Sequence, residues 1–233
     1  MNSLHALVQA GKVLYLGISD TPAWIVVKCN DYARQHGMTQ FSVYQGHWSA
    51  AFRDFERDII PMCEAEGMGL APWGSLGRGQ FKSQEEYNDP NREGRKMGPQ
   101  SDKFVRVAKK LEEIAKKKNT LITSIALAYV MHKTPYVFPI VGGRKVEHLK
   151  GNIEALGIKL TQQEIDEIED AEPFDVGFPQ SFLFGAGGKP YRSRYTTNDI
   201  YLVNSNYPLE TVQKVNPIEP RQGEEKLGPM LSK

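Results

Sequence analysis

Four places in the chain carry polar, glycine or basic residues just after an apolar run. They are Ser19-Asp20, Gln45, the stretch "PWGSLGRG" at 72–79 and the stretch "GGRKVEHLKGN" at 142–152. The first two offer short polar side chains with both donor and acceptor capacity, which is the inventory needed to hold a carboxamide. Binding of a carboxamide is therefore the first expectation for these positions.

The third and fourth stretches suit an aromatic ring and phosphates. Trp73 offers a flat ring, the glycines after it let the backbone approach a phosphate closely, and Arg78 supplies charge. Gly142 and Gly143 precede an expected helix start, where backbone donors, the helix dipole and basic side chains favour an anion. Those basic side chains are Arg144, Lys145 and His148. A carboxamide, a ring, a pyrophosphate and a further phosphate, in that order, describe NADPH.

Each of these features also has a plainer interpretation. A Ser-Asp pair after a strand commonly forms a helix-capping turn, and Gln45 or Trp73 taken singly fits ordinary packing. The "GRG" turn at 77–79 fits a plain loop, and "GGRK" at 142–145 fits a solvated basic turn. Their joint occurrence at successive strand ends favours the cofactor interpretation.

The elements that must position these residues follow from hydrophobic periodicity and turn residues. After a helix-like opening run, short apolar runs predict strands at 13–18, 41–45, 69–71 and 136–141, and helical spacing predicts helices at 21–37, 55–67, 102–118, 124–132, 145–156 and 161–171. Thr21 is expected to cap its helix and Gly37 to end it, while Thr161 and Glu164 form a capping box. Residues 82–101 lack a pattern and are expected to form a surface loop.

Short strands alternating with longer helices predict an α/β fold with parallel strands and both sheet faces covered. The chain supplies four such units, whereas an eight-unit barrel needs ~250 residues. We therefore expect half of a (β/α)8 TIM barrel at 1–172, followed at 173–233 by a long irregular segment that covers the barrel. Its aromatic side chains either line a substrate mouth or pack over the core; they are Phe178, Phe182, Phe184 and Tyr191.

Composition narrows the function classes. The chain has 233 residues, 40% of them hydrophobic and 24% charged, as in ordinary globular proteins, and its net charge of +1 argues against nucleic-acid or membrane partners. Cys29 and Cys63 are too few for a disulfide framework, no apolar run approaches the ~20 residues of a membrane span, and no signal segment is recognisable. These observations predict a cytoplasmic location.

Metal and phosphate-loop chemistry find no support in the motifs. The sequence contains no His-Glu-x-x-His and no paired cysteines, and the acidic run "DEIED" at 166–170 is expected to be the exposed face of the last helix. "GAGGK" at 185–189 lacks the Ser or Thr and the flanking strand and helix of a phosphate loop.

Four stretches carry a resemblance to a known family: "GKVLYLGISDTPAW" at 11–24, "YQGHW" at 44–48, "LAPWGSLGRGQF" at 70–81 and "VFPIVGGRKVEHLKGNIEAL" at 137–156. In order and length they closely resemble the aldo-keto reductase superfamily, and within it the fungal aryl-alcohol dehydrogenase and norsolorinic acid reductase-like branch. The resemblance covers roughly residues 1–179. It implies a (β/α)8 TIM barrel, of which this chain would be the C-terminal half, and NADP(H) as the cofactor.

The resemblance also implies roles for individual residues. Ser19, Asp20 and Gln45 take the positions that bind the nicotinamide carboxamide, and Trp73 takes the position that stacks on the nicotinamide ring. The loop that covers the pyrophosphate contains Gly74, Leu76, Arg78 and Gly79. Arg144, His148 and Asn152 take the positions that bind the adenosine 2′-phosphate and the adenine, with the backbone of Gly142 nearby.

Three departures from the family pattern matter. The usual Asn after the serine is Asp20, which accepts but does not donate when it is ionised. A Glu that commonly precedes the adenine-contacting Asn is replaced by Gly151. The family's catalytic Asp, Tyr, Lys and His lie on the first half of the barrel, before the resemblance begins. No catalytic residue is therefore assigned here, and Tyr44 and His47 are not expected to replace the missing acid.

The resemblance implies an NADP-dependent oxidoreductase that reduces aryl aldehydes or ketones to alcohols, in fungal secondary metabolism, with its catalytic half absent from a truncated chain. The alternative is a catalytically inactive NADPH-binding or regulatory remnant, and a third hypothesis is a remnant that binds nothing. Half a barrel leaves unpaired strand edges, so we expect self-association or pairing with the missing half. Stabilisation by the cofactor separates the third hypothesis from the others.

Overall fold

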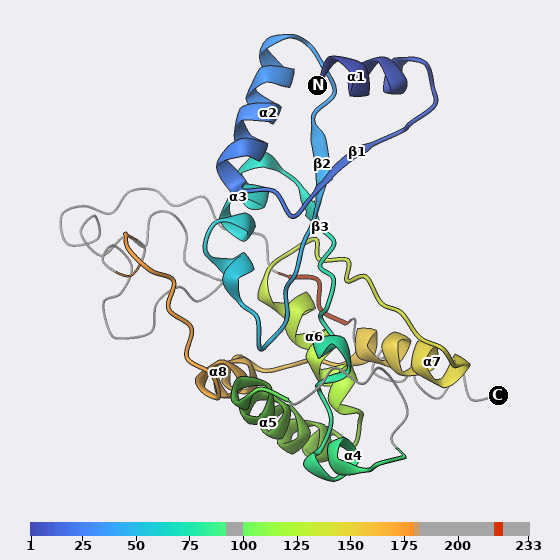
Figure 1. The fold of residues 1–233 in the computed structure, drawn as a ribbon, viewed down its shortest axis with the longest axis vertical. Helices are drawn as coiled ribbons and strands as arrows, with labels where there is room; N and C mark the ends of the chain where they lie inside the picture. The colour runs from blue at the N-terminus through green and yellow to red at the C-terminus, as the bar shows by residue number, and fades with distance from the viewer. Residues whose placement is uncertain (92–99, 180, 182–216, 221–233) are drawn as a thin grey trace.

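Strands and helices alternate along the first part of the chain, as the sequence predicts (Figure 1). The structure, a computed structural model, describes residues 1–91, 100–179, 181 and 217–220. In chain order its elements are α1 (Asn2–Gln9), β1 (Leu16–Ser19), α2 (Ala23–Gln35), β2 (Phe41–Gln45), the 3-10 helix η1 (Asp54–Glu56), α3 (Ile59–Glu66), β3 (Gly69–Leu70), the 3-10 helix η2 (Gly77–Gly79), α4 (Gln84–Asn88), α5 (Asp102–Lys118), α6 (Ile122–Lys133), α7 (Val146–Glu154), the 3-10 helix η3 (Ala155–Gly157) and α8 (Gln162–Asp170).

The three strands form one parallel sheet in the order β1-β2-β3. Leu70 of β3 extends the ladder to a further segment, because its N–H donates to the Tyr136 carbonyl at 2.9 Å and its carbonyl accepts from the Phe138 N–H at 2.7 Å. Val137 forms a parallel bridge with Leu70. The predicted fourth strand therefore runs beside β3, although it pairs through a single bridge. The carboxyl ends of these segments meet at one edge of the sheet, since all of them run parallel.

The two faces of the sheet differ in burial. Tyr44 is 3% exposed, whereas its neighbours Val43 and Gln45 on β2 are exposed on the other face. Leu14 and Tyr15, which precede β1, are 79% and 78% exposed. A sheet with apolar side chains exposed on one face is compatible with a partial barrel, in which that face would look inward.

The core lies where α5, α6 and α8 pack together and extends up to the sheet (Figure 1). α5 is amphipathic and spans the predicted residues 102–118, because apolar side chains recur at helical spacing along it. Its fully or nearly buried side chains are Phe104, Val107, Ala108, Leu111, Ile114 and Ala115. α8 begins with the predicted capping box, in which Thr161 and Glu164 bond to each other's backbone N–H.

A buried cluster of charged residues ties η1 to α6 and α8. Glu56 is fully buried and pairs with Arg53 at 2.8 Å and with Lys133 at 3.5 Å. Glu169 pairs with Arg53 at 3.2 Å and also with Lys133. Burial opposes ionisation of Glu56, but Lys133 and Arg53 hold the pKa of its carboxyl well below the usual range. The expectation that 166–170 is an exposed face is therefore wrong for Glu169, which α8 turns toward Lys133.

Two further predictions about helices are wrong. Thr21 does not cap α2, because its hydroxyl donates to the Ser19 carbonyl at 2.9 Å and Pro22 takes the N-cap position. The single helix predicted at 55–67 is divided into η1 and α3, and Pro61 falls within the first turn of α3, where its missing N–H costs nothing.

Residues 82–101 are not all loop. Ser83 caps the short helix α4, and its hydroxyl and the Glu86 carboxylate form a reciprocal capping box. A five-residue helix leaves too little hydrophobic period to detect, although Ser-x-x-Glu at 83–86 is the sequence signature of such a start.

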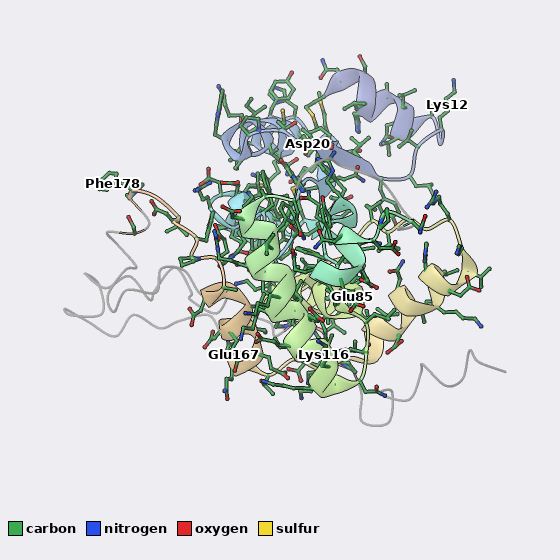
Figure 2. The ribbon with its side chains drawn as sticks, turned by 60° about the horizontal axis from the view of Figure 1, so that its bottom comes forward. Lys12, Asp20, Glu85, Lys116, Glu167 and Phe178 are labelled. Atoms are coloured by element: carbon green, nitrogen blue, oxygen red, sulfur yellow. The ribbon has the colours of Figure 1, made fainter. Side chains whose placement is uncertain are left out.

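The predicted C-terminal segment is described only in part. Phe178 is 81% exposed and points away from the body of the molecule in Figure 2. Phe182, Phe184 and Tyr191 lie outside the described residues, so the division at 172 stays a prediction. Within the described ranges, no helix is both long and apolar enough to cross a membrane.

Candidate functional site

The ends of β1 and β2 bring three of the expected site residues side by side. Ser19 lies opposite Gln45 in the parallel register, and the N–H of Asp20 donates to the Gln45 carbonyl at 3.0 Å. Asp20 has a φ of +47°, a left-handed conformation that Asp and Asn adopt more readily than most residues. The side chains of Ser19, Asp20 and Gln45 are all exposed. They offer donors and acceptors to a small polar group at the sheet edge.

The carboxylate of Asp20 joins the first strand end to the third. One oxygen accepts from the Ser19 hydroxyl at 3.1 Å, and the other accepts from the indole N–H of Trp73 at 3.3 Å. In Figure 2, Asp20 is labelled in the upper part of the view, next to the end of β1. Because the strands are parallel, the end of β1 lies near the residues that follow β3. Asp20 therefore reaches the edge of the Trp73 ring, although the two residues are 53 positions apart.

Trp73 belongs to a stack of three rings. Its indole lies 4.3 Å from the His47 ring with planes 6° apart, and His47 in turn lies 4.1 Å from Phe52 with planes 18° apart. Two cations lie near the stack, with the Arg78 guanidinium 5.9 Å from the Trp73 centroid and the Lys103 ammonium 5.0 Å from that of Phe52. One face of Trp73 is therefore fixed by His47.

His47 is inserted in this stack as a neutral ring. Burial, and then the positive charges of Arg78 and Lys103, lower the pKa of the imidazole. Its Nε2 atom is buried without a hydrogen-bond partner among the described residues. Such a ring suits a role as a support for Trp73 better than one in proton transfer, because neither side of the stack leaves it open to a reacting atom.

Tyr44 is likewise occupied. Its hydroxyl donates to the Thr21 carbonyl at 2.7 Å and accepts from the Thr21 N–H at 3.0 Å. Burial raises the pKa of the phenol. These bonds hold the start of α2 against β2, which is a structural task. That Tyr44 is not the acid stays a prediction.

The loop after Trp73 is shaped by glycines that no other residue could replace without movement. Gly74 has a φ of +77°, and a Cβ there would lie 2.7 Å from the His47 ring. Gly77 has a φ of +70°, and a Cβ there would lie 2.6 Å from the Phe81 ring. Arg78 follows with a φ of +54° and an exposed side chain. Leu76 is half-buried, and Gly79 closes η2 at a φ of +86°. This tight loop presents backbone and one guanidinium beside Trp73.

The fourth strand end forms a separate exposed turn at the start of α7. Gly142 has open space around it, whereas a Cβ on Gly143 would lie 2.8 Å from that of His148. The N–H of Arg144 donates to Nδ1 of His148 at 3.3 Å, which closes the turn. Arg144 and His148 are exposed, and Asn152 is half-buried further along α7. Figures 1 and 2 both place α7 away from the end of β1, so the two groups of candidate residues would contact different parts of one extended ligand.

Sequence reasoning missed the part played by His47 and Phe52. The only signal was the aromatic pattern in "HWSAAF" at 47–52, which does not reveal that the chain turns back between Ser49 and Phe52. In the part of the chain that the structure describes, no group of three His, Cys, Asp or Glu side chains is suited to a metal ion.

Comparisons with known proteins agree on one family. A family model described as "Aldo/keto reductase family" matches residues 1–173. Norsolorinic acid reductase A of Aspergillus parasiticus is 66% identical over 228 residues, which are 98% of this chain and 58% of that protein. An aryl-alcohol dehydrogenase of Pestalotiopsis microspora is 50% identical over 226 residues, 96% of this chain and 57% of that protein. The chain therefore spans somewhat more than half the length of these relatives.

A solved structure supports the fold. A thermostable aldo-keto reductase crystallised with the inhibitor epalrestat matches with a TM-score of 0.56 and 24% identity, over 73% of this chain and 53% of that one. This likeness indicates an α/β fold of the TIM-barrel type, with the observed parallel sheet as part of it.

Proposed function

The chain belongs to the aldo/keto reductase family, and from this we propose that it is the cofactor-binding half of an NADP-dependent oxidoreductase that reduces aryl aldehydes or ketones to alcohols. Relatives named norsolorinic acid reductase and aryl-alcohol dehydrogenase support this substrate class and a place in fungal secondary metabolism. The chain would form the C-terminal half of a TIM barrel, located in the cytoplasm. The substrate would be a small carbonyl compound or, in the reverse direction, its alcohol.

One observation carries the proposal: Ser19, Asp20 and Gln45 gather at one edge of the sheet, and Asp20 contacts the edge of the Trp73 indole. This arrangement suits a flat ring that carries a carboxamide. The ring would lie on the face of Trp73 that His47 leaves free, and the amide would reach the side chains of Gln45 and Asp20.

The neighbouring loops fit the remaining parts of a dinucleotide. Glycine at 74 and 77 lets this loop turn tightly against the rings of His47 and Phe81, and the loop presents the exposed guanidinium of Arg78, which suits a pyrophosphate. Arg144 and His148 at the start of α7 suit a second phosphate, because the helix N-terminus and the guanidinium both favour an anion. A bound nicotinamide cofactor would supply the hydride, and these residues would bind and orient it.

No described residue is assigned as the proton donor. Tyr44 is bonded twice to Thr21, and His47 is enclosed between two rings. A general acid would have to come from a segment outside the four strand ends seen here. The alternative proposal, a catalytically inactive NADPH-binding or regulatory protein, would use the same cofactor-binding residues without such an acid.

The test is a titration of NADPH into the chain, followed by tryptophan fluorescence. The chain contains Trp24, Trp48 and Trp73, and Trp73 is the one expected against the cofactor. We expect saturable quenching that Trp73→Ala abolishes and that the control Trp24→Phe preserves, because Trp24 is 64% exposed on α2.

A second variant tests the phosphate assignment. Arg144→Ala should weaken binding of NADPH and leave binding of NADH nearly unchanged, since the two cofactors differ only in the 2′-phosphate. Equal loss for both would contradict the role of Arg144, and absence of quenching in a folded sample would contradict the cofactor site itself.

A further inference from the structure

We propose that the charge of Asp20 shifts the affinity ratio of this site toward the oxidised, positively charged nicotinamide ring and away from the reduced, neutral one. The inference rests on the proposed function, because it needs a nicotinamide cofactor on Trp73. It goes further because it assigns a specific effect to the charge of one side chain. That effect is on the relative affinities of the oxidised and reduced cofactor.

The first step is the charge of Asp20. Both of its oxygens accept hydrogen bonds, one from the Ser19 hydroxyl and one from the Trp73 indole N–H, and a group that only accepts is an ionised carboxylate. An amide at this position could accept from the indole N–H through its oxygen and donate to the Ser19 hydroxyl through its nitrogen, so it would keep both contacts without the charge. Two accepted bonds are the pattern that a carboxylate makes, and the negative charge of a carboxylate is what the inference uses.

The second step is distance. The carboxylate oxygen lies 3.3 Å from the indole nitrogen, at the edge of the ring. A ring stacked on the indole lies about 3.5 Å above it, the contact distance of carbon atoms. The carboxylate is then roughly 5 Å from the stacked ring, well inside the screening length of ~8 Å at physiological ionic strength.

The third step is what the neighbouring charges do. Arg78 is a cation close to Trp73, with its guanidinium 5.9 Å from the ring centroid. Its charge acts on the phosphates and on the ring, but the phosphates are identical in NADP⁺ and NADPH. His47 behind Trp73 is held neutral, as its lowered pKa indicates, and adds no charge. The contribution that Asp20 makes to the ratio of the two affinities therefore comes from the charge of the nicotinamide ring alone.

The size of the effect follows from Coulomb's law. A unit charge about 5 Å from another, at a partly solvated sheet edge, changes a binding ratio by about tenfold. For a two-electron couple a tenfold change corresponds to about 30 mV, here in the direction that makes the bound cofactor a stronger reductant. Asp20 would in this way favour release of hydride to a carbonyl.

The test compares dissociation constants of NADP⁺ and NADPH, measured by calorimetry at one pH and ionic strength, for the natural chain and Asp20→Asn. Asn keeps the shape and tolerates the positive φ, so only the charge is lost. We expect NADP⁺ binding to weaken relative to NADPH by about tenfold in the variant. Asp20→Gly, which also accepts a φ of +47°, should change the ratio by the same factor and replaces Asn if that variant does not fold.

Arg144→Ala is the matched control, because it should weaken both forms equally and leave their ratio unchanged. A ratio that stays within about twofold in both Asp20 variants, with both cofactors bound, would overturn the inference and leave the proposed cofactor site intact. If the natural chain binds neither form, the cofactor site and the inference are overturned together.

Discussion

The rings of His47 and Trp73 lie face to face, with centroids 4.3 Å apart and planes 6° from parallel. The contact is held from both sides, since Phe52 stacks on the other face of His47 and the N–H of Trp48 donates to the Trp73 carbonyl at 3.2 Å. The position of the Trp73 ring therefore depends on His47, which contacts only one of its two faces.

Stability should fall in mild acid because of His47. Burial and the charges of Arg78 and Lys103 lower its pKa, so below about pH 6.5 the unfolded chain takes up a proton that the folded chain resists. The free energy of unfolding should therefore decrease as pH falls from about 6.5 toward the lower folded pKa. Buried His132, whose pKa burial also lowers, should act in the same direction.

The variant His47→Phe separates the contributions of the two histidines to the pH dependence of stability. It keeps an aromatic ring between Phe52 and Trp73 but removes one titrating group, so urea unfolding should show a shallower loss of stability between about pH 7 and pH 5. The remaining loss belongs to His132. An unchanged pH dependence would show that His47 is not held neutral in the folded chain.

Parallel pairing explains why much of the site could be predicted from sequence. Apolar runs located the strands, and the carboxyl ends of parallel strands necessarily meet at one edge, so Ser19 and Gln45 had to be neighbours. Glycine and proline located the turns. The same rule placed Trp73 at the third end without any knowledge of its contacts.

The rest depends on long-range packing that has no local signal. The stacking of His47 requires the return of the chain between Ser49 and Phe52, which two backbone bonds of 3.1 Å fix. Glu169 reads as part of an exposed acidic run because nothing in its neighbourhood reveals Lys133 on α6. Buried polar contacts of this kind are determined by which elements pack together, not by periodicity.

Gly74 should be far less tolerant of alanine than Gly37. Both have positive φ, +77° and +64°, so each substitution strains the backbone by ~1–2 kcal/mol. A Cβ on Gly37 meets nothing within 4 Å, whereas one on Gly74 would lie 2.7 Å from the His47 ring. Gly74→Ala should therefore cost about 3 kcal/mol in all and displace the stack.

Urea unfolding of both variants measures the difference, and NADPH quenching should weaken only in Gly74→Ala. Equal stability losses, with quenching retained in both, would mean that His47 moves aside at no cost and does not hold Trp73.

Breaking the buried ionic cluster should lower the free energy of unfolding, whether a cation or an anion is removed. Lys133→Met leaves Glu56 with one fewer cation in a fully buried position, and removal of one partner of a buried pair typically costs about 3–5 kcal/mol. Lys116→Met, which breaks an exposed pair with Glu112, should have a much smaller effect. Chemical unfolding near neutral pH compares the two.

Acid should act on the same cluster. The pKa of Glu56 is lowered in the folded state, so its contribution is present above the ordinary carboxyl pKa of about 4.3 and is lost as pH falls through the lower folded value. Adding Glu56→Gln to Lys133→Met should recover part of the loss, because the uncompensated charge is then gone. A double variant less stable than the sum of the single changes would contradict this account.

Asn30 should be the most sensitive polar residue of α2. It is fully buried; its side-chain oxygen accepts from the Phe41 N–H at 2.9 Å and its amide donates to Glu66 at 3.0 Å. Asn30→Ala leaves the first N–H of β2 without its partner, at a cost of about 1–3 kcal/mol. Asn30→Asp keeps the acceptor for Phe41 but sets a second carboxylate against Glu66, so its loss of stability should shrink as acid protonates the pair.

Hydrogen exchange at the Phe41 amide distinguishes the variants. The exchange rate should increase in Asn30→Ala by more than the loss of global stability predicts. If the exchange rate follows global stability alone, Asn30 does not hold the start of β2.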